Sequence, residues 1–441
     1  MTSENGATRT APAANVQAMS ARYFYGWNVV GATFVMALLS FGLGFYGLSV
    51  YVATLQRLHG WSASVVSAPV TVYYVAGAVL TAAIGDLYER FGPRAVVAGG
   101  SVAMAAGVAA LGVVTQPWQL YPTFLVMSLG WGAMSGAAVN IILAPWFQRR
   151  RGLVVSIAFN GATLGGVIIA PALILLIGAV GFTPALEVAA LVLLVVLVAV
   201  AAGVMRRGPE ELGLGPDGDP PPSTRAYPEV SGARGWRGEA VRTWRFWSVS
   251  APFALGLTAQ VGVLTHLVAL VTPMLGAGGA ARAVSATTAA ALIGRLVTGF
   301  VVDRLNRRLV SSATLVIQMI GLALLAWAAS PMVVYAGCAL FGLGVGNLTT
   351  LPGLILAVEW PREQFSALVG LVVGINQFTF AFGPSLVGVV RDWSGTYGVA
   401  LGACTALQAI AAALVLLGPS RFLRRPTTPR LSGSGASRRS R

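Results

Sequence analysis

Residues 85–94 read GDLYERFGPR and residues 299–308 read GFVVDRLNRR, so one pattern of glycine, acid and arginines occurs twice in this chain of 441 residues. Other landmarks recur at nearly the same spacing. Leu129–Gly132 returns as Phe341–Gly344, Trp146 as Trp360, and Pro171 as Pro384. A spacing shared by several landmarks indicates an internal repeat, so the chain is expected to consist of two similar halves.

The sequence around both blocks is apolar over long stretches. Hydrophobic residues make up 56% of the chain and charged residues only 10%, whereas about a quarter of an ordinary soluble domain is charged. Residues 95–148 contain no charged residue at all. Because a helix needs roughly 20 apolar residues to cross a bilayer, this stretch holds two membrane spans and a turn. The chain is therefore predicted to be a polytopic membrane protein.

Twelve apolar runs separated by polar turns predict the membrane helices. They lie at about 27–51, 62–86, 94–115, 118–147, 152–180, 183–205, 246–275, 283–303, 309–330, 331–358, 364–390 and 396–419. The predicted fold is an all-α membrane protein with twelve transmembrane helices in two six-helix halves. Its predicted parts are residues 1–24 (N-terminal tail), 25–205 (first half), 206–245 (linker), 246–420 (second half) and 421–441 (basic tail). The linker is polar and proline-rich, which is typical of a flexible connection.

All 29 basic residues are arginines, and they gather at alternate ends of the predicted helices. Because basic loops stay in the cytoplasm, both termini and the linker are expected inside the cell, with the chain in the cytoplasmic (inner) membrane. The richer side holds Arg90, Arg94, Arg149, Arg150, Arg151, Arg304, Arg307, Arg308 and Arg362, and the poorer side holds Arg57, Arg282 and Arg391. This distribution argues against a nucleic-acid partner despite the net charge of +15. Membrane lipids are the expected contact, and the basic tail either rests on anionic headgroups or is solvated.

The repeated block predicts a conformational latch at the cytoplasmic side of each half. Gly85 and Gly299 lack a side chain and would let a neighbouring helix approach closely. The acids that follow, Glu89 and Asp303, would then meet an arginine or the positive N-terminus of that helix. The arginines available for such pairs are Arg90, Arg94, Arg304 and Arg308. The alternative is a topological anchor of mixed charge.

The two blocks resemble the signature of the major facilitator superfamily, a Gly-x-x-x-Asp-Arg-x-Gly-Arg-Arg pattern between helices two and three that is echoed between helices eight and nine. The resemblance extends from about Tyr25 to Gly418. The sequence departs from the pattern at Glu89, Pro93 and Asn306, but the charge pattern remains. The resemblance implies the fold of this superfamily and secondary transport by two halves that rock around a central site.

A narrower resemblance concerns the branch of monocarboxylate carriers and oxalate/formate exchangers. Residues 25–27 before helix one, residues 146–152 before helix five, and Gly294-Arg295 in helix eight are similar to that branch. In it the arginine of helix eight binds the substrate carboxylate, and by position this role falls on Arg295. The resemblance therefore implies a small organic anion as the substrate.

The position of Arg295 supports a binding role on physical grounds as well. Its neighbours on both sides are apolar, and it lies eight residues before Asp303, or roughly 12 Å from the cytoplasmic end at 1.5 Å per residue. An arginine at this depth costs at least about 2.5 kcal/mol and persists only when it faces a cavity or a partner. The alternative is a structural arginine that donates to carbonyl groups of broken helices.

Two differences from that branch bear on the substrate and on energy coupling. Ala291 stands where animal monocarboxylate carriers have an aspartate that takes part in proton coupling, so a coupling proton stays an open partner. The oxalate exchangers have a second cation in helix eleven, whereas residues 365–390 carry no charge. One deep arginine without a second cation favours one carboxylate over two.

Further polar residues in the predicted helices are weaker candidates for substrate binding. They are His266, Asn140, Asn347, Asn376 and Gln377. Each has an ordinary alternative, because a buried histidine or amide also bonds to neighbouring membrane helices. Cys338 and Cys404 lie in apolar segments and are expected to pack as small apolar residues, so neither a metal site nor a disulfide is predicted.

These patterns favour a secondary transporter of a small organic anion, most simply a monocarboxylate. A drug or neutral-solute exporter of the same fold is the alternative, and in it Arg295 would be structural. No Walker-type loop or nucleophile elbow occurs in the sequence, so no cofactor, catalytic site or enzymatic activity is expected. A receptor that senses a solute without moving it is a third hypothesis, although larger cytoplasmic domains than this linker usually accompany that role.

Overall fold

The computed structural model describes residues 24–206, 208–219, 240–302 and 304–418, and these residues form helices without any strand. The first half contains α1 (Gly26–Phe41), the π-turn η3 (Gly42–Tyr46), α2 (Gly47–His59), α3 (Ala63–Ala82), α4 (Ile84–Leu111), α5 (Leu120–Ala133), α6 (Gly136–Leu143), α7 (Arg151–Leu164), the π-turn η5 (Gly165–Ile169), α8 (Ala170–Val180) and α9 (Phe182–Gly203). The second half contains α11 (Trp244–Val301), α12 (Arg307–Ala326), α13 (Pro331–Gly344), α14 (Asn347–Glu359), α15 (Arg362–Phe380), α16 (Gly383–Ser394) and α17 (Tyr397–Leu416). Short 3-10 turns lie at Pro117–Gln119, Glu210–Leu212 and Pro216–Gly218.

The helices supply twelve membrane crossings. Eleven helical segments of the described residues are long and apolar enough to span a bilayer. The longest, α11, has 58 residues and is interrupted at Gly276, where φ is +67°. Arg308, which follows α11, donates to the carbonyl of Ser248 near its start, so the chain turns back at Gly276 and α11 holds two spans. The predicted all-α fold is confirmed, and the two predicted tails and linker residues 220–239 lie almost wholly outside the described residues.

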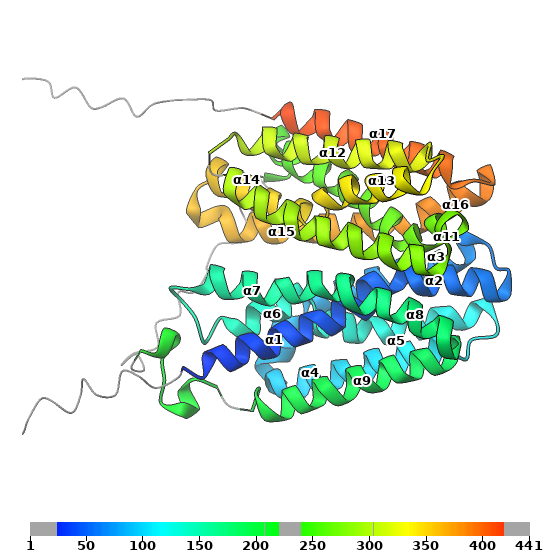
Figure 1. The fold of residues 1–441 in the computed structure, drawn as a ribbon. Helices are drawn as coiled ribbons and strands as arrows, with labels where there is room; N and C mark the ends of the chain where they lie inside the picture. Colours follow the sequence, from blue (N-terminus) through cyan, green and yellow to red (C-terminus); the bar gives the residue numbers. More distant parts are fainter. Residues whose placement is uncertain (1–23, 207, 220–239, 303, 419–441) are drawn as a thin grey trace, which may run out of the picture.

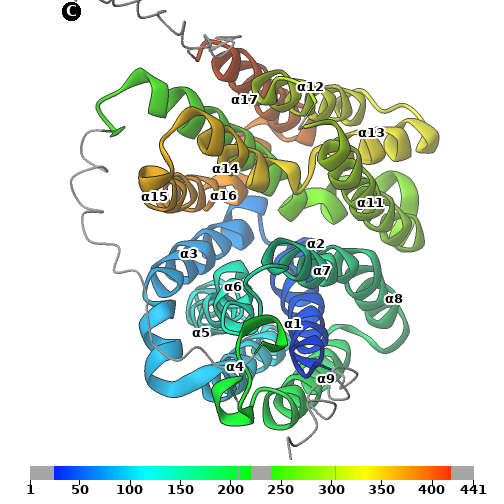
Figure 2. The ribbon, with the colours of Figure 1, turned by 90° about the vertical axis from the view of Figure 1, so that its left-hand side faces the viewer.

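The two halves lie side by side, with α1 to α9 below and α11 to α17 above in Figure 1. The start of α1 and the ends of α9 and α17 share the left-hand end of the bundle, which we call the linker end. The other end, which holds the start of α3 and the end of α16, is called the opposite end. Figure 2 looks onto the linker end and shows the boundary between the halves running through the middle of the molecule.

Small residues hold neighbouring helices close within each half. Gly130 of α5 packs against Gly100 and Met104 of α4, and a Cβ atom at Gly130 would meet their backbone. Gly321 of α12 packs in the same way against the backbone of α13. Membrane helices depend on such close packing because lipid supplies no hydrophobic force between them. The two helix pairs occupy corresponding places in the halves, as an internal repeat requires.

Several spans are interrupted near their middle. The π-turns η3 and η5 interrupt the first and fifth spans, and short breaks separate α5 from α6, α13 from α14, and α15 from α16. Irregular backbone at membrane depth is tolerated only where it is buried in protein or lines a cavity. Substrate sites of transporters with repeated halves form at such discontinuous helices. A substrate site is therefore expected in the middle of the bundle.

Candidate substrate site

Arg295 lies in the second span of α11 and reaches across the boundary between the halves. Its Nη1 donates a hydrogen bond to the Oγ1 of Thr163 in α7, at 3.2 Å. On another side lies Gly346, in the break between α13 and α14, where φ is +89°. A Cβ atom at Gly346 would collide with the guanidinium. Glycine therefore provides both the left-handed backbone and the space that Arg295 occupies.

The guanidinium of Arg295 has no acidic partner among the residues that the structure describes. None of the ion pairs found there includes it, and its Nε is buried without an acceptor. The Tyr46 ring lies next to Gly166 of η5, beside Thr288 in the span that carries Arg295. A buried cation without a counter-ion is costly. A bound carboxylate would supply both the missing charge and the missing acceptors.

Asn347 follows Gly346 directly and is buried. Its Nδ2 donates to the carbonyl of Leu343 in the preceding turn, at 3.1 Å, and its Oδ1 is buried without a partner. Because Nδ2 already donates to Leu343, the unpartnered Oδ1 is the group that Asn347 can offer to a ligand. Of the predicted amides, Asn347 is therefore the one that the fold places beside a neighbour of Arg295.

The other predicted amides lie on separate helices. Asn376 of α15 is buried with an unpartnered Oδ1, and Gln377 beside it is half-buried. Asn140 of α6 is half-buried and donates to Gly136 of its own helix at 3.0 Å. Within the described part of the chain, no hydrogen bond joins these three amides to Arg295.

His266 is buried inside the second half and uses both ring nitrogens there. Its Nε2 lies 3.0 Å from the carbonyl oxygen of Pro384, and its Nδ1 lies 3.2 Å from the hydroxyl of Tyr397. A carbonyl only accepts, so Nε2 carries a proton and donates a hydrogen bond to Pro384, while Nδ1 bonds to the Tyr397 hydroxyl. These contacts join α11 to α16 and α17. Bonding between helices was the alternative to substrate binding that the sequence left open for His266.

The two cysteines pack inside the second half. Cys338 of α13 and Cys404 of α17 are both buried and both free thiols. Each belongs to the hydrophobic core of the bundle. Among the described residues, no group of three or more histidine, cysteine, aspartate or glutamate side chains could hold a metal ion.

The first repeated block lies at the linker end with its charges exposed. Glu89 and Arg90 are exposed, and no ion pair of the described chain includes either residue. The guanidinium of Arg90 lies 5.2 Å from the ring centroid of Phe91. No neighbouring atom lies within 4 Å of the place where a Cβ would stand on Gly85 or Gly299. The close approach predicted at these glycines is absent from this structure, because no other helix packs against them here.

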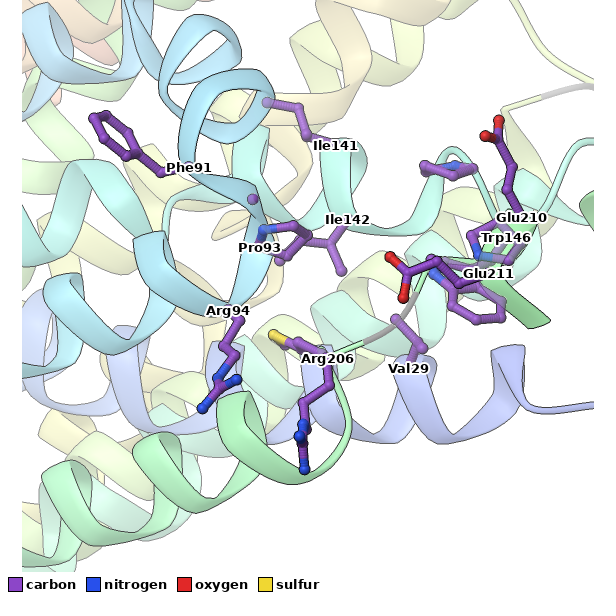
Figure 3. Close-up of a pocket in the computed structure, with 15 residues that line it drawn as sticks. Val29, Phe91, Pro93, Arg94, Ile141, Ile142, Trp146, Arg206, Glu210 and Glu211 are labelled. Atoms are coloured by element: carbon purple, nitrogen blue, oxygen red, sulfur yellow. The ribbon is translucent and has the colours of Figure 1, made fainter.

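Arg94 lines a pocket of about 470 Å³ at the linker end of the first half. Figure 3 shows Arg94 and Arg206 together on one side of this pocket and the carboxylates of Glu210 and Glu211 on another. The pocket lies between the first half and the start of the linker. Neither Arg295 nor its partner Thr163 lines it, so it is separate from the candidate substrate site.

Asp217 ties the start of the linker to the first half. Its carboxylate accepts hydrogen bonds from the backbone N–H groups of Gln148, at 3.1 Å, and Arg149, at 2.8 Å. Burial acts to raise the pKa of Asp217, but these backbone hydrogen bonds and the nearby Arg149 guanidinium outweigh burial and hold the pKa below its usual value. The carboxylate is therefore ionised at neutral pH and fixes the linker to the turn before α7.

Arg308 of the second block is buried within its own half. Its guanidinium forms a bidentate ion pair with Glu359 of α14, with N–O distances of 2.7 and 2.8 Å. Its Nη1 also donates to the carbonyl groups of Ser248 in α11 and Val415 in α17. Arg308 therefore holds four helices of one half together. Arg304 of the same block is exposed, and Asp303 lies outside the described residues.

The two blocks differ because their surroundings differ. Glu359 precedes Trp360 in the second half, whereas Pro145 precedes the corresponding Trp146 in the first. Arg94 consequently has no acid where Arg308 has one. The repeat therefore gives a buried anchor in one half and an exposed charged loop in the other.

Comparison with known proteins identifies the family. The family model of the Major Facilitator Superfamily matches residues 33–283 and 273–440, which together cover most of the chain. The chain belongs to this superfamily. Its predicted membership is confirmed, and the protein is a multi-pass membrane transporter of the major facilitator type.

Individual relatives of this major facilitator protein are distant. It is 28% identical over 385 residues to MFS-type transporter 1 of Ophiocordyceps sp. (strain BCC 1869), a match covering 82% of this chain and 77% of that protein. It is 27% identical over 420 residues to monocarboxylate transporter 11 of Homo sapiens, covering 91% and 78%. The crystal structure of the nucleoside transporter NupG (D323A mutant) superimposes with a TM-score of 0.72 at 11% identity, covering 90% of this chain and 100% of that one. At this identity the structural likeness shows the fold alone.

The halves of this major facilitator protein are clasped at the opposite end by residues that the sequence did not single out. Asp392, near the end of α16, accepts hydrogen bonds from the backbone N–H groups of Ala63, at 3.0 Å, and Ser64, at 2.7 Å. These are the first residues of α3, so the carboxylate also faces the positive end of a helix dipole. Thr71 and Ser385 share a hydroxyl hydrogen bond of 2.6 Å further along the same pair of helices. We call these contacts the α3–α16 clasp.

Three buried amide side chains form a chain of hydrogen bonds that joins three helices of the second half of the transporter. Gln318 of α12 donates to Gln260 of α11 and accepts from Gln408 of α17, with both distances at 2.7 Å. All three side chains are almost fully buried. The sequence contains these residues in three distant segments, so only the fold brings them together.

Proposed function

We propose that this transporter carries a small organic anion with a single carboxylate across the cytoplasmic membrane by alternating access. The observation that carries the proposal is Arg295, a buried guanidinium between the two halves that has no acidic partner among the described residues. Its Nη1 already bonds to Thr163, and its Nε is free of acceptors. A carboxylate would form a bidentate, charge-assisted pair with such a group.

The proposal of one carboxylate rests on the lack of a second deep cation. Residues 365–390, which include most of α15 and α16, carry no charge. A second carboxylate would therefore be buried there without a partner, which is costly. Asn347 offers an acceptor beside the break at Gly346 and suits a hydroxyl or another neutral donor of the solute.

The proposed orientation places the linker end in the cytoplasm, because the arginine-rich loops gather there. The hydrogen bonds that join the halves in the described chain lie in the middle and at the opposite end. They are Arg295–Thr163, Ser285–Val167, Thr71–Ser385 and those of Asp392. The halves are therefore held together at the opposite end in this structure. In the alternate state, the exposed Glu89 and the uncovered Gly85 would engage the second half as a latch.

The test replaces Arg295 in the full-length protein and measures carboxylate uptake into proteoliposomes. Arg295→Lys keeps the charge but loses the planar fork, so binding should weaken markedly. Arg295→Gln should abolish uptake, since breaking one side of a buried charge pair costs about 2–5 kcal/mol, or at least roughly thirtyfold in affinity. Arg282→Gln is the matched control, because Arg282 lies on the same helix but is exposed. Uptake by Arg295→Gln at the wild-type rate would disprove the proposal.

The alternative function is export of a drug or another neutral solute. The hydrogen bond from Arg295 to Thr163 supports it, because this bond would give the arginine a structural role between the halves. The two functions differ in their need for a carboxylate. Binding of a neutral solute that Arg295→Gln leaves unchanged would favour the exporter.

A further inference from the structure

A group of aromatic side chains lies at the interruption of the first span. α1 ends at Phe41, and η3 adds Phe45 and Tyr46. Trp131 of α5 contacts both phenylalanines, with ring centroids 4.9 Å from Phe41 and 6.1 Å from Phe45. The ring of Tyr46 lies edge-on to Phe45 at 5.1 Å. Four rings from two interrupted spans therefore form one surface.

This surface is connected to Arg295 from two sides. Phe159 of α7 lies 6.4 Å from Phe41 and is one helical turn before Thr163, which accepts the hydrogen bond from Arg295. Residues four apart on a helix share a face. On the other side, the ring of Tyr46 lies next to Gly166, beside Thr288 in the span that carries Arg295. We call Phe41, Phe45, Tyr46, Trp131 and Phe159 the aromatic cluster.

The aromatic cluster faces the boundary between the halves. Phe45 contacts Tyr74 at 6.3 Å, and Tyr74 contacts Phe380 of the second half at 5.4 Å. Tyr46 lies against Gly166, which in turn packs on Thr288 of α11. All of these contacts lead from the first half into the second.

The exposure of the rings shows where an occupant would fit. Trp131 is 5% exposed, but Phe41, Phe45, Tyr46 and Phe159 are only half-buried. The cluster borders Arg295 through Thr163 and the second half through Tyr74 and Gly166, so a solute held by Arg295 would lie close to these partly exposed rings. Partly exposed apolar rings beside a single charged group are typical of a small-molecule site.

We infer that the transported anion carries an aromatic ring, with its carboxylate on Arg295 and its ring against the aromatic cluster. This inference rests on the proposed function and names its substrate class. Aromatic pairs favour offset or edge-to-face packing at centroid distances of about 4.5–7 Å, and the cluster presents rings in both orientations. Acids of two or three carbons are too short to cover these rings, and sugar acids would place hydroxyl groups against them.

The experiment measures binding and uptake with benzoate, propionate and neutral benzamide, using the purified full-length transporter at one pH and salt concentration. Wild-type protein should prefer benzoate to propionate by roughly tenfold or more, as hydrophobic pocket discrimination allows. Phe45→Ala should reduce this preference to about threefold or less, because benzoate binding weakens more than propionate binding. Phe45→Leu keeps an apolar side chain without the ring, and should give an intermediate preference if Phe45→Ala folds poorly.

Phe378→Ala is the matched control, because Phe378 is an exposed aromatic residue of α15 outside the aromatic cluster; it should keep the wild-type preference. Equal binding of benzoate and propionate, both lost in Arg295→Gln, would overturn the aromatic class and leave the proposed function standing. Benzamide bound as well as benzoate, or binding of no carboxylate at all, would overturn both.

Discussion

Removing the carboxylate of Asp392 should open the opposite end of the transporter. Asp392→Ala deletes two hydrogen bonds to the first turn of α3, and hydrogen bonds to charged groups contribute about 1.5–3 kcal/mol each. The Asp392 side chain is 20% exposed, so the lower value applies and the two bonds together contribute about 3 kcal/mol. That energy corresponds to roughly a hundredfold change in the ratio of open to closed states. Asp392→Asn retains one acceptor and should cause about half this change in energy.

The measurement is the distance distribution between spin labels at Leu58 of α2 and Met274 of α11, both exposed near the opposite end. The buried Cys338 and Cys404 are first replaced by alanine. Asp392→Ala should add a population at longer distance. Glu187→Ala is the control, since Glu187 is an exposed acid of α9 near the same end and touches no part of the clasp. If Asp392→Ala gave the same distance distribution as Glu187→Ala and the parent protein, the clasp would contribute nothing to closure.

Two further predictions concern the second half and the orientation. Gln318→Leu should lower the thermal stability of the detergent-solubilised protein, because it leaves the buried Oε1 of Gln260 without its donor and removes one of the two hydrogen bonds from Gln408 Nε2. Each buried unsatisfied group costs about 1–3 kcal/mol, so an unchanged melting temperature would contradict a role in stabilising the second half. A reporter inserted at Pro221 should lie in the cytoplasm and one inserted at Gly278 outside it, and reversed signals would refute the proposed orientation.

The sequence predicts the fold because membrane burial leaves a strong signal in composition. Apolar runs of sufficient length can only be helices, and the repeated block fixes the relation of the halves. The predicted end of the seventh span near residue 275 agrees with the turn at Gly276. The sequence did not reveal the π-turns η3 and η5, because an i to i+5 bond within a helix changes neither length nor hydrophobicity.

The site was only partly predictable. Arg295 stands out because a deep charge is expensive in lipid, whereas its neighbours Thr163 and Gly346 are ordinary residues of membrane helices. Their roles depend on contacts between segments far apart in the chain. Asp392 had a signal of its own, an acid near the end of a span, but its partners are backbone N–H groups that no side-chain pattern marks.

The clasp and the substrate place different requirements on the same movement. A solute can shift the balance between two states only by as much as its affinity differs between them, so an anion bound equally well to Arg295 in both states would not open the opposite end. Contacts of about the strength of the clasp, roughly 3 kcal/mol, must therefore form elsewhere when it breaks. In the proposed latch, the exposed Glu89 and the uncovered Gly85 at the linker end would supply them. Glu89→Gln and Asp392→Asn should accordingly displace the balance in opposite directions while the affinity set by Arg295 stays the same.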